Sequence, residues 1–92
     1  MPRRFRNAIG PAVRRLRVER VLTQDQLAAR LVLAGLQNAD RVWVAKVEAQ
    51  IRSVFDYELA LIAVVLGVTA DELLPKGKEL KKDLPALQEG ER

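Results

Sequence analysis

The chain has 92 residues, a formal net charge of +4, and neither cysteine nor histidine. This length supports one small domain with a single hydrophobic core. Without cysteine and histidine there is no disulfide framework, no thiolate or imidazole metal site and no histidine-based catalysis. The sequence also has no phosphate-binding loop and no carboxylate pair in an apolar context. We therefore expect no catalytic residues, no metal, no cofactor and no small-molecule ligand.

Basic residues are concentrated at the N-terminal end. Residues 1–22 contain seven arginines against one glutamate, whereas residues 23–74 contain four basic and seven acidic residues. Such a cationic segment attracts polyanions, although a solvated surface that keeps the protein soluble explains it equally well. The longest uncharged run, residues 59–70, is too short to cross a bilayer, and the arginine-rich start lacks a hydrophobic signal core. We expect a cytoplasmic protein without membrane contact.

Residues 1–8 lack periodicity and are expected to form a flexible basic arm. A first helix should begin at Gly10-Pro11, since proline is tolerated at the first helical position, and should end near Val21. Its apolar stripe consists of Ile9, Val13 and Leu16.

Thr23 and Gln26 have the spacing of a capping box and predict the start of a second helix. Gly35 is expected to end it. Its buried stripe consists of Leu27, Ala28 and Leu31.

The segment DRVWVAKVE, residues 40–48, predicts a third helix capped by Asp40. Its core side contains Val44 and Val47, and its other side carries small residues around one lysine: Val42, Ala45, Lys46 and Ala49. Small residues beside a long polar one let a helix approach the base edges in a major groove about 12 Å wide. Alanine is also the best helix former, so this pattern alone does not establish DNA binding.

A fourth helix should be capped by Asp56 and end at Gly67, and a capping box of Thr69 and Glu72 starts a short fifth helix. The stripe of the fourth helix consists of Leu59, Ile62, Ala63 and Leu66. Residues 9–75 are therefore predicted to form an all-α bundle of about five short helices. Residues 76–92 form a charged tail in which helical spacing of leucines is interrupted by Pro85, so the tail could be partly helical.

The run IGPAVRRLRVERVLTQDQLAARL, followed by DRVWVAKVEAQIRSVFDYELALIAVVLGVTADELL, resembles the lambda-repressor/Cro-like (XRE-like) helix-turn-helix family. The similarity covers about residues 9–74. Its strongest motifs are LR at 16–17, TQ..LA at 23–28, VE at 47–48 and YELALIA…LGVTADEL at 57–73. The resemblance implies a small transcriptional regulator that binds double-stranded DNA sequence-specifically and is associated with the nucleoid.

The resemblance also implies roles for individual residues. The DNA contacts would be Gln24 at the start of the second helix, Arg41, Val42 and Lys46 on a recognition helix over about 41–49, and Arg52 and Ser53 on the backbone phosphates. Arg17 would pair with Glu48 and brace the recognition helix. Glu48 ends an otherwise apolar turn, so its partial burial would itself require a partner. For Gln24, helix capping alone is the plain alternative.

Two departures from the family concern the region around the third helix. The stretch LVLAGLQNA is longer than the usual tight turn, so the second helix could be longer or the connection looser. Trp43 stands where the family usually has a small or hydroxyl residue. We favour packing over a DNA contact for Trp43, because an indole gains most from burial.

The fourth helix has a second apolar face, formed by Leu61, Val64 and Val65. A helix that is apolar all round needs cover on both sides. We favour a homodimer, in which two recognition helices about 34 Å apart would read a pseudo-palindromic site. Cover by the tail leucines Leu80, Leu84 and Leu87 remains open.

A protein-interaction module on the same fold, either antitoxin-like or a regulatory subunit, is the alternative function. Exposed apolar surface on the fourth helix would favour it. The two functions differ in where the cations lie: a common surface of Arg41, Lys46 and Arg52 with Gln24 favours DNA, and scattered cations favour the interaction module.

Overall fold

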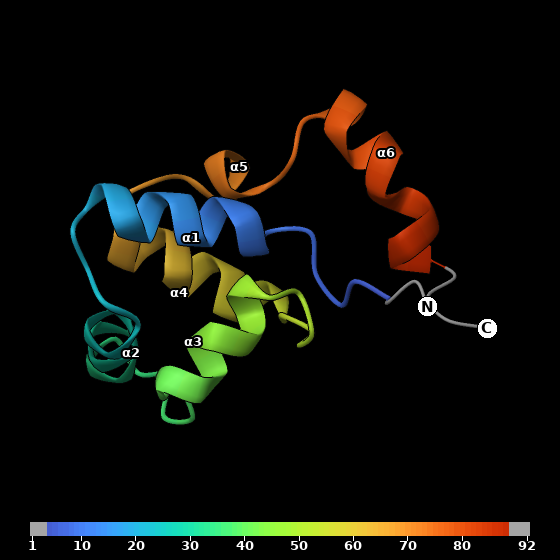
Figure 1. Ribbon diagram of the computed structural model, residues 1–92. Coiled ribbons are helices and arrows are strands. Elements are labelled where there is room, and N and C mark those ends of the chain that lie inside the picture. Colours follow the sequence, from blue (N-terminus) through green and yellow to red (C-terminus); the bar gives the residue numbers. More distant parts are fainter. Residues whose placement is uncertain (1–3, 89–92) are drawn as a thin grey trace.

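The computed structural model describes residues 4–88, which form six helices and no strand (Figure 1). The helices are α1 (Gly10–Glu19), α2 (Gln24–Leu33), α3 (Arg41–Glu48), α4 (Asp56–Leu66), α5 (Ala70–Leu73) and α6 (Gly77–Gln88). The predicted all-α class is confirmed, with α6 as a sixth helix in the tail. Within the described part of the chain, no helix is both long and apolar enough to span a membrane.

Side-chain caps fix where most helices begin. The Thr23 hydroxyl accepts the Gln26 N–H at 3.0 Å, and the Gln26 side chain accepts the Thr23 N–H at 2.8 Å. Asp40 accepts the Trp43 N–H at 2.7 Å at the start of α3. Because each cap satisfies N–H groups that have no partner within the helix, it fixes the first turn. These predicted starts are confirmed.

The predicted cap of α4 is wrong by one residue. Phe55 occupies the N-cap position, and Asp56 is the first helical residue. The reason is Glu58, which is buried and accepts the Phe55 N–H at 2.9 Å. A carboxylate at the third position of a helix can reach back to the N–H of the N-cap residue. Glu58 fills this role here, and Asp56 is exposed to solvent.

The core lies between α1, α2, α3 and α4. The predicted stripes are buried, except that Leu59 is only half-buried. The connection from α2 to α3 also contributes, since Leu36 and Ala39 are buried. α2 still ends at Leu33, and the Leu36 N–H donates to the Leu31 carbonyl at 2.9 Å after a turn at Gly35, where φ is +113°. The longer connection is therefore packed against the core, and it neither lengthens α2 nor hangs loose.

The segment before α1 is bound to the rest of the molecule, which differs from the expected flexible arm. Phe5 N–H donates to the Ala86 carbonyl at 3.1 Å, and Arg6 N–H donates to the Gln50 carbonyl at 2.8 Å. These bonds satisfy backbone groups that a free arm would leave to water. This difference concerns residues 4–8 of the predicted arm, because Met1–Arg3 lie outside the described residues. Residues 89–92 of the predicted tail also lie outside them.

The tail does not cover α4 over the part that is described. In Figure 1, α6 lies beside the N-terminal segment and apart from α4. The Arg4 Nε donates to the Leu87 carbonyl at 3.2 Å, which ties the segment before α1 to the end of α6. Val64, on the outer face of α4, is 72% exposed.

α1 approaches the end of α3 closely at Gly10. A Cβ atom added at Gly10 would lie 2.5 Å from the Val47 carbonyl oxygen and 2.8 Å from that of Glu48. Only a glycine lets the two backbones come so close.

We predict that Gly10→Ala lowers the free energy of unfolding by about 1–3 kcal/mol, because the added methyl group forces α1 and α3 apart. Urea denaturation measures this change. Gly77→Ala is the matched control, since its added Cβ meets nothing within 4 Å. Equal stability of the two variants would contradict the close approach.

Candidate nucleic-acid interface

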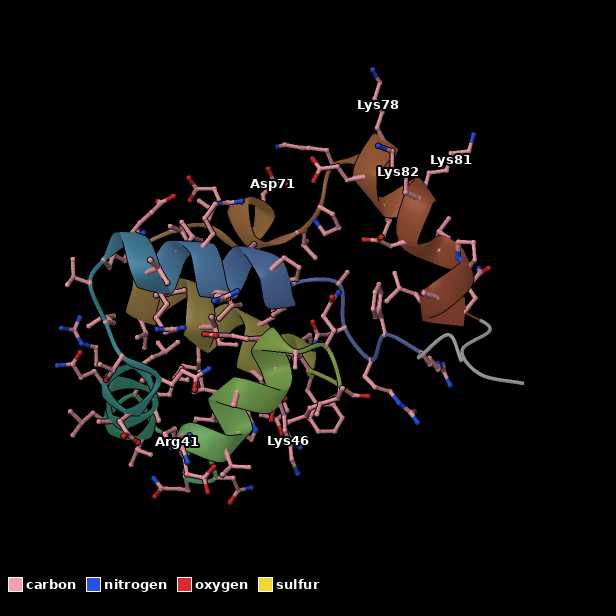
Figure 2. The ribbon with its side chains drawn as sticks, viewed as in Figure 1. Arg41, Lys46, Asp71, Lys78, Lys81 and Lys82 are labelled. Atoms are coloured by element: carbon pink, nitrogen blue, oxygen red, sulfur yellow. The ribbon has the colours of Figure 1, made fainter. Side chains whose placement is uncertain are left out.

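The outer face of α3 is exposed to solvent and consists mostly of short side chains. Trp43, Val44 and Val47 are buried on its inner side. Figure 2 shows Arg41 and Lys46 extending from α3 at the lower edge of the molecule in this view, and both are exposed. The other residues of this face are Val42, Ala45 and Ala49. The face therefore carries two long cations above small side chains.

An ion pair between α1 and α3 fixes the position of this face. The Arg17 Nε donates to Glu48 Oε2 at 2.6 Å and its Nη2 donates to Oε1 at 3.1 Å, with 12% and 5% of the two side chains exposed. The third guanidinium nitrogen, Nη1, donates to the Leu22 carbonyl at 2.7 Å. The two-pronged geometry sets orientation as well as distance. The structure thus joins the two residues expected to form the brace.

The charge of Arg17 is secured by the same contact. The hydrogen bond from Arg17 to Glu48 raises the pKa of the Arg17 guanidinium, the nearby negative charge adds to this, and burial opposes it. A raised pKa for a cation means that its contribution to stability is present below the unfolded pKa and is lost only as pH rises through the folded one. That loss falls in strongly alkaline solution, so the brace is intact across the neutral range.

Gln24 belongs to this network. Its side-chain Nε2 donates to Glu48 Oε1 at 3.1 Å, and the residue is half-buried. The amide nitrogen at the start of α2 is therefore bound to the last residue of α3. Capping position alone gave no indication of this partner, because the two residues are 24 positions apart in the sequence.

Lys46, Arg52 and Ser53 come together around one shallow concavity of ≈ 370 Å³. The remaining residues that line it are Arg6 and Ile51. Arg6 was expected only as part of a flexible arm, and no local pattern placed it beside α3. The concavity thus gathers three cations and one hydroxyl, which is chemistry suited to a phosphate.

Asn7 explains why Arg6 is there. Asn7 is buried, and its Nδ2 donates to the Val47 carbonyl at 3.1 Å and to the Arg52 carbonyl at 2.8 Å. Its Oδ1 accepts the Ile9 and Gly10 N–H groups at 3.1 and 2.8 Å. One amide side chain therefore links the start of α1 to the end of α3 and to the loop that follows.

Trp43 is 6% exposed, and it packs in the core as favoured from the sequence. The Arg52 guanidinium carbon lies 5.2 Å from the centre of its ring. Arg52 Nη2 also lies 3.5 Å from Glu58 Oε2. No sequence pattern indicated this contact between Arg52 and Glu58.

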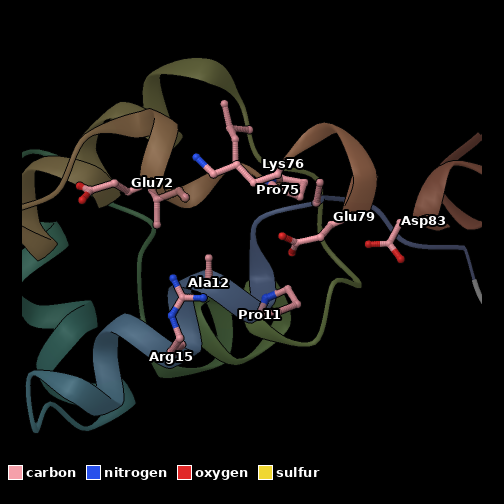
Figure 3. A pocket seen from close by; sticks show the side chains of 11 residues that line it. Pro11, Ala12, Arg15, Glu72, Pro75, Lys76, Glu79 and Asp83 are labelled. Carbon is pink, nitrogen blue, oxygen red and sulfur yellow. The ribbon is translucent and has the colours of Figure 1, made fainter. Parts of the chain in front are cut away.

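A second hollow, of ≈ 200 Å³, lies between α1 and the α5–α6 region (Figure 3). Its charges are mixed, with Arg15 and Lys76 beside Glu72, Glu79 and Asp83. It lies away from α3 and lacks the uniform charge of the concavity beside Lys46. Among residues 4–88, no group of three or more acidic, histidine or cysteine side chains could hold a metal ion.

The outer face of α4 is partly apolar. Leu61 and Val65 are half-buried against the core, whereas Val64 projects outward. At the start of the helix, the rings of Phe55 and Tyr57 stack with their centres 5.7 Å apart, and both side chains are more than half exposed. Of the three residues of the predicted second apolar face, only Val64 is therefore largely exposed. The Phe55–Tyr57 pair adds exposed aromatic surface at the start of the helix.

Comparison with known protein families finds no match for the sequence, and comparison with curated proteins finds none either. Among solved structures, the chain is similar to the crystal structure of the hypothetical transcription factor NHTF from Neisseria. The TM-score is 0.65 at 28% sequence identity, and the match covers 85% of this chain and 84% of that one. The chain has a transcription-factor-like fold.

We predict that Glu48→Ala lowers the free energy of unfolding by about 1–3 kcal/mol, because it leaves the largely buried Arg17 charge without its partner. Urea denaturation at neutral pH measures the loss. The double variant Arg17→Met with Glu48→Leu removes both charges and should be clearly more stable than the single variant. If the single and double variants are equally destabilised, the buried charge is not the cause.

Proposed function

We propose that this protein is a small transcriptional regulator of the lambda-repressor/Cro-like type, which binds double-stranded DNA sequence-specifically with α3 in the major groove. The observation that carries the proposal is the run of cations from the outer face of α3 to the concavity lined by Lys46 and Arg52. The transcription-factor-like fold supports it. Such a protein would act on nucleoid DNA in the cytoplasm.

Base reading would fall to the outer face of α3. Small residues let this helix approach the base edges, where Arg41 and Lys46 can donate to guanine and Val42 can contact a thymine methyl group. Gln24 would add a contact through its side-chain oxygen, because its nitrogen is bound to Glu48. The brace at Glu48 would hold the helix at the angle that these contacts need.

Phosphate binding would fall to the concavity. Arg52, Ser53 and Arg6 lie on its wall together with Lys46. Cations that neutralise phosphates supply affinity that is independent of sequence and falls with salt. They also set the register of α3 on the duplex.

The outer face of α4 supports a homodimer, with Leu61, Val64 and Val65 at its centre. Two copies of α3 about 34 Å apart would then read two half-sites one turn apart. Sedimentation equilibrium should give twice the mass of the chain at concentrations that bind DNA. A monomer at those concentrations would contradict the dimer.

The exposed Phe55–Tyr57 pair and Val64 also favour a second candidate, a protein-interaction module that is antitoxin-like or a regulatory subunit. Exposed apolar surface of this kind often marks contact with another protein. We place it second because Lys46 and Arg52 line one concavity together with Ser53, and Arg41 lies on the same face of α3 as Lys46. Gln24 does not line this concavity and is bound to Glu48.

We predict that Lys46→Ala weakens binding to a duplex selected by this protein by about 1–3 kcal/mol, with a smaller loss on random duplex. Fluorescence anisotropy with both duplexes measures the two losses. Lys81→Ala is the charge-matched control, because Figure 2 shows Lys81 on α6, away from Arg41 and Lys46. Equal losses for the two variants, or equal losses on the two duplexes, would show that Lys46 contributes only charge.

A further inference from the structure

We infer that Trp43 is a positioning residue for DNA binding and acts through Arg52. Its buried indole holds the Arg52 guanidinium at the wall of the concavity, so that this cation meets a DNA phosphate already oriented. The inference rests on the proposed DNA-binding function and adds a role for a side chain that itself lies in the core.

The indole forms the first of two restraints on the guanidinium. Trp43 is 6% exposed, so the packing of the core fixes the plane of its ring. The Arg52 guanidinium carbon lies 5.2 Å from the ring centre, which is within the range of about 6 Å for a cation–π contact. The face of tryptophan is the most favourable for such a contact. A core residue therefore sets where a cation lies at the surface.

Glu58 forms the second restraint. It is buried, its Oε1 accepts the Phe55 N–H at 2.9 Å, and its Oε2 lies 3.5 Å from Arg52 Nη2. The backbone of Arg52 is also held, since its carbonyl accepts the Asn7 Nδ2 at 2.8 Å. Arginine side chains lose considerable rotamer freedom when they are fixed. Here that freedom is already lost before DNA arrives, which favours binding.

The guanidinium still has capacity for a ligand. The side chain of Arg52 is 33% exposed and lines the concavity beside Lys46 and Ser53. The contact with Glu58 is long and uses Nη2. Of the five N–H donors of a guanidinium, the one on Nε is buried, which leaves the planar fork of the two Nη atoms for a ligand. A phosphate oxygen in the concavity can accept from this fork while the ring and the carboxylate hold its plane.

Two N–H donors in the stack form no hydrogen bond with residues 4–88. Trp43 Nε1 and Arg52 Nε are both buried, and neither has a hydrogen-bond partner among the described residues. Buried donors without partners lower stability. Hydrogen bonds from these two donors therefore do not account for the stack. Its position at the concavity fits a role in orienting Arg52 for a phosphate.

A double-mutant cycle tests the inference with the full chain and a fluorescein-labelled 30-base-pair duplex of random sequence, since phosphate contacts do not depend on sequence. We expect Trp43→Leu to weaken duplex binding about threefold to tenfold, from the usual range of cation–π energies. In the background of Arg52→Gln, the same change should alter binding less than about twofold, because the cation that the ring positions is gone. Arg52→Gln alone should lower the salt slope by about one.

Two further variants separate positioning from packing. Trp43→Phe keeps an aromatic face and should retain most of the affinity that Trp43→Leu loses. Val44→Ala removes buried volume from the same helix, and any effect on binding should be the same with Arg52 or Gln at position 52. Thermal unfolding identifies the temperature at which each variant is folded, and binding is measured there. If Trp43→Leu does not fold, the cycle is run with Trp43→Phe, whose smaller loss must also depend on Arg52.

Tryptophan fluorescence supplies a readout that does not involve DNA. Trp43 is the only tryptophan of the chain, so its emission reports the stack alone. We expect Arg52→Gln to change the emission of the DNA-free protein, and unchanged emission would contradict the stack. Equal losses from Trp43→Leu in both backgrounds would overturn the positioning role and leave DNA binding in place. If the wild-type protein binds no duplex at all, the proposed function fails and the positioning role fails with it.

Discussion

The orientation of α3 depends on the buried ion pair between Arg17 and Glu48, which ties the end of this helix to α1. Two charges removed from water are costly unless their geometry and remaining hydrogen bonds are satisfied. Leu22 supplies an acceptor for Arg17, and Gln24 supplies a donor for Glu48. Because few arrangements of the first three helices satisfy all these groups, the network specifies one angle for α3. That angle also sets the direction in which the outer face of α3 points.

The segment before α1 holds the loop that follows α3. Asn7 binds the Val47 and Arg52 carbonyls, and Gly10 lets α1 come close enough for this contact. The same segment places Arg6 beside Lys46. The outer face of α3, which we propose reads the bases, and the concavity, which we propose binds phosphate, are thus parts of one arrangement, in which buried polar side chains position exposed cations. This is why we interpret the cations together and not as a solvated surface.

Sequence reasoning succeeded where the determinants are local. The capping boxes at Thr23 and Thr69 and the apolar stripes need only residues three or four positions apart. It failed where the partner is remote: the Asn7 contact with Arg52 spans 45 residues, and no periodicity marks it. The error at Asp56 has a different origin, because Glu58 lies only three residues from Phe55. The local spacing allows either residue to cap the helix, and the hydrogen bond from the Phe55 N–H to Glu58 decides between them. The Arg17–Glu48 contact is also remote. The apolar turn before Glu48 indicated that this carboxylate needs a partner, and the family resemblance indicated that the partner is Arg17.

Selection from a random pool of double-stranded DNA with the purified protein at moderate salt tests the central claim most directly. The account predicts enrichment of a motif with two related half-sites whose centres lie about one duplex turn apart. A single enriched half-site would retain the reading helix and contradict the dimer. Retention of DNA only at low salt, without any enriched motif, would contradict sequence-specific recognition by α3 and leave charge as the sole attraction.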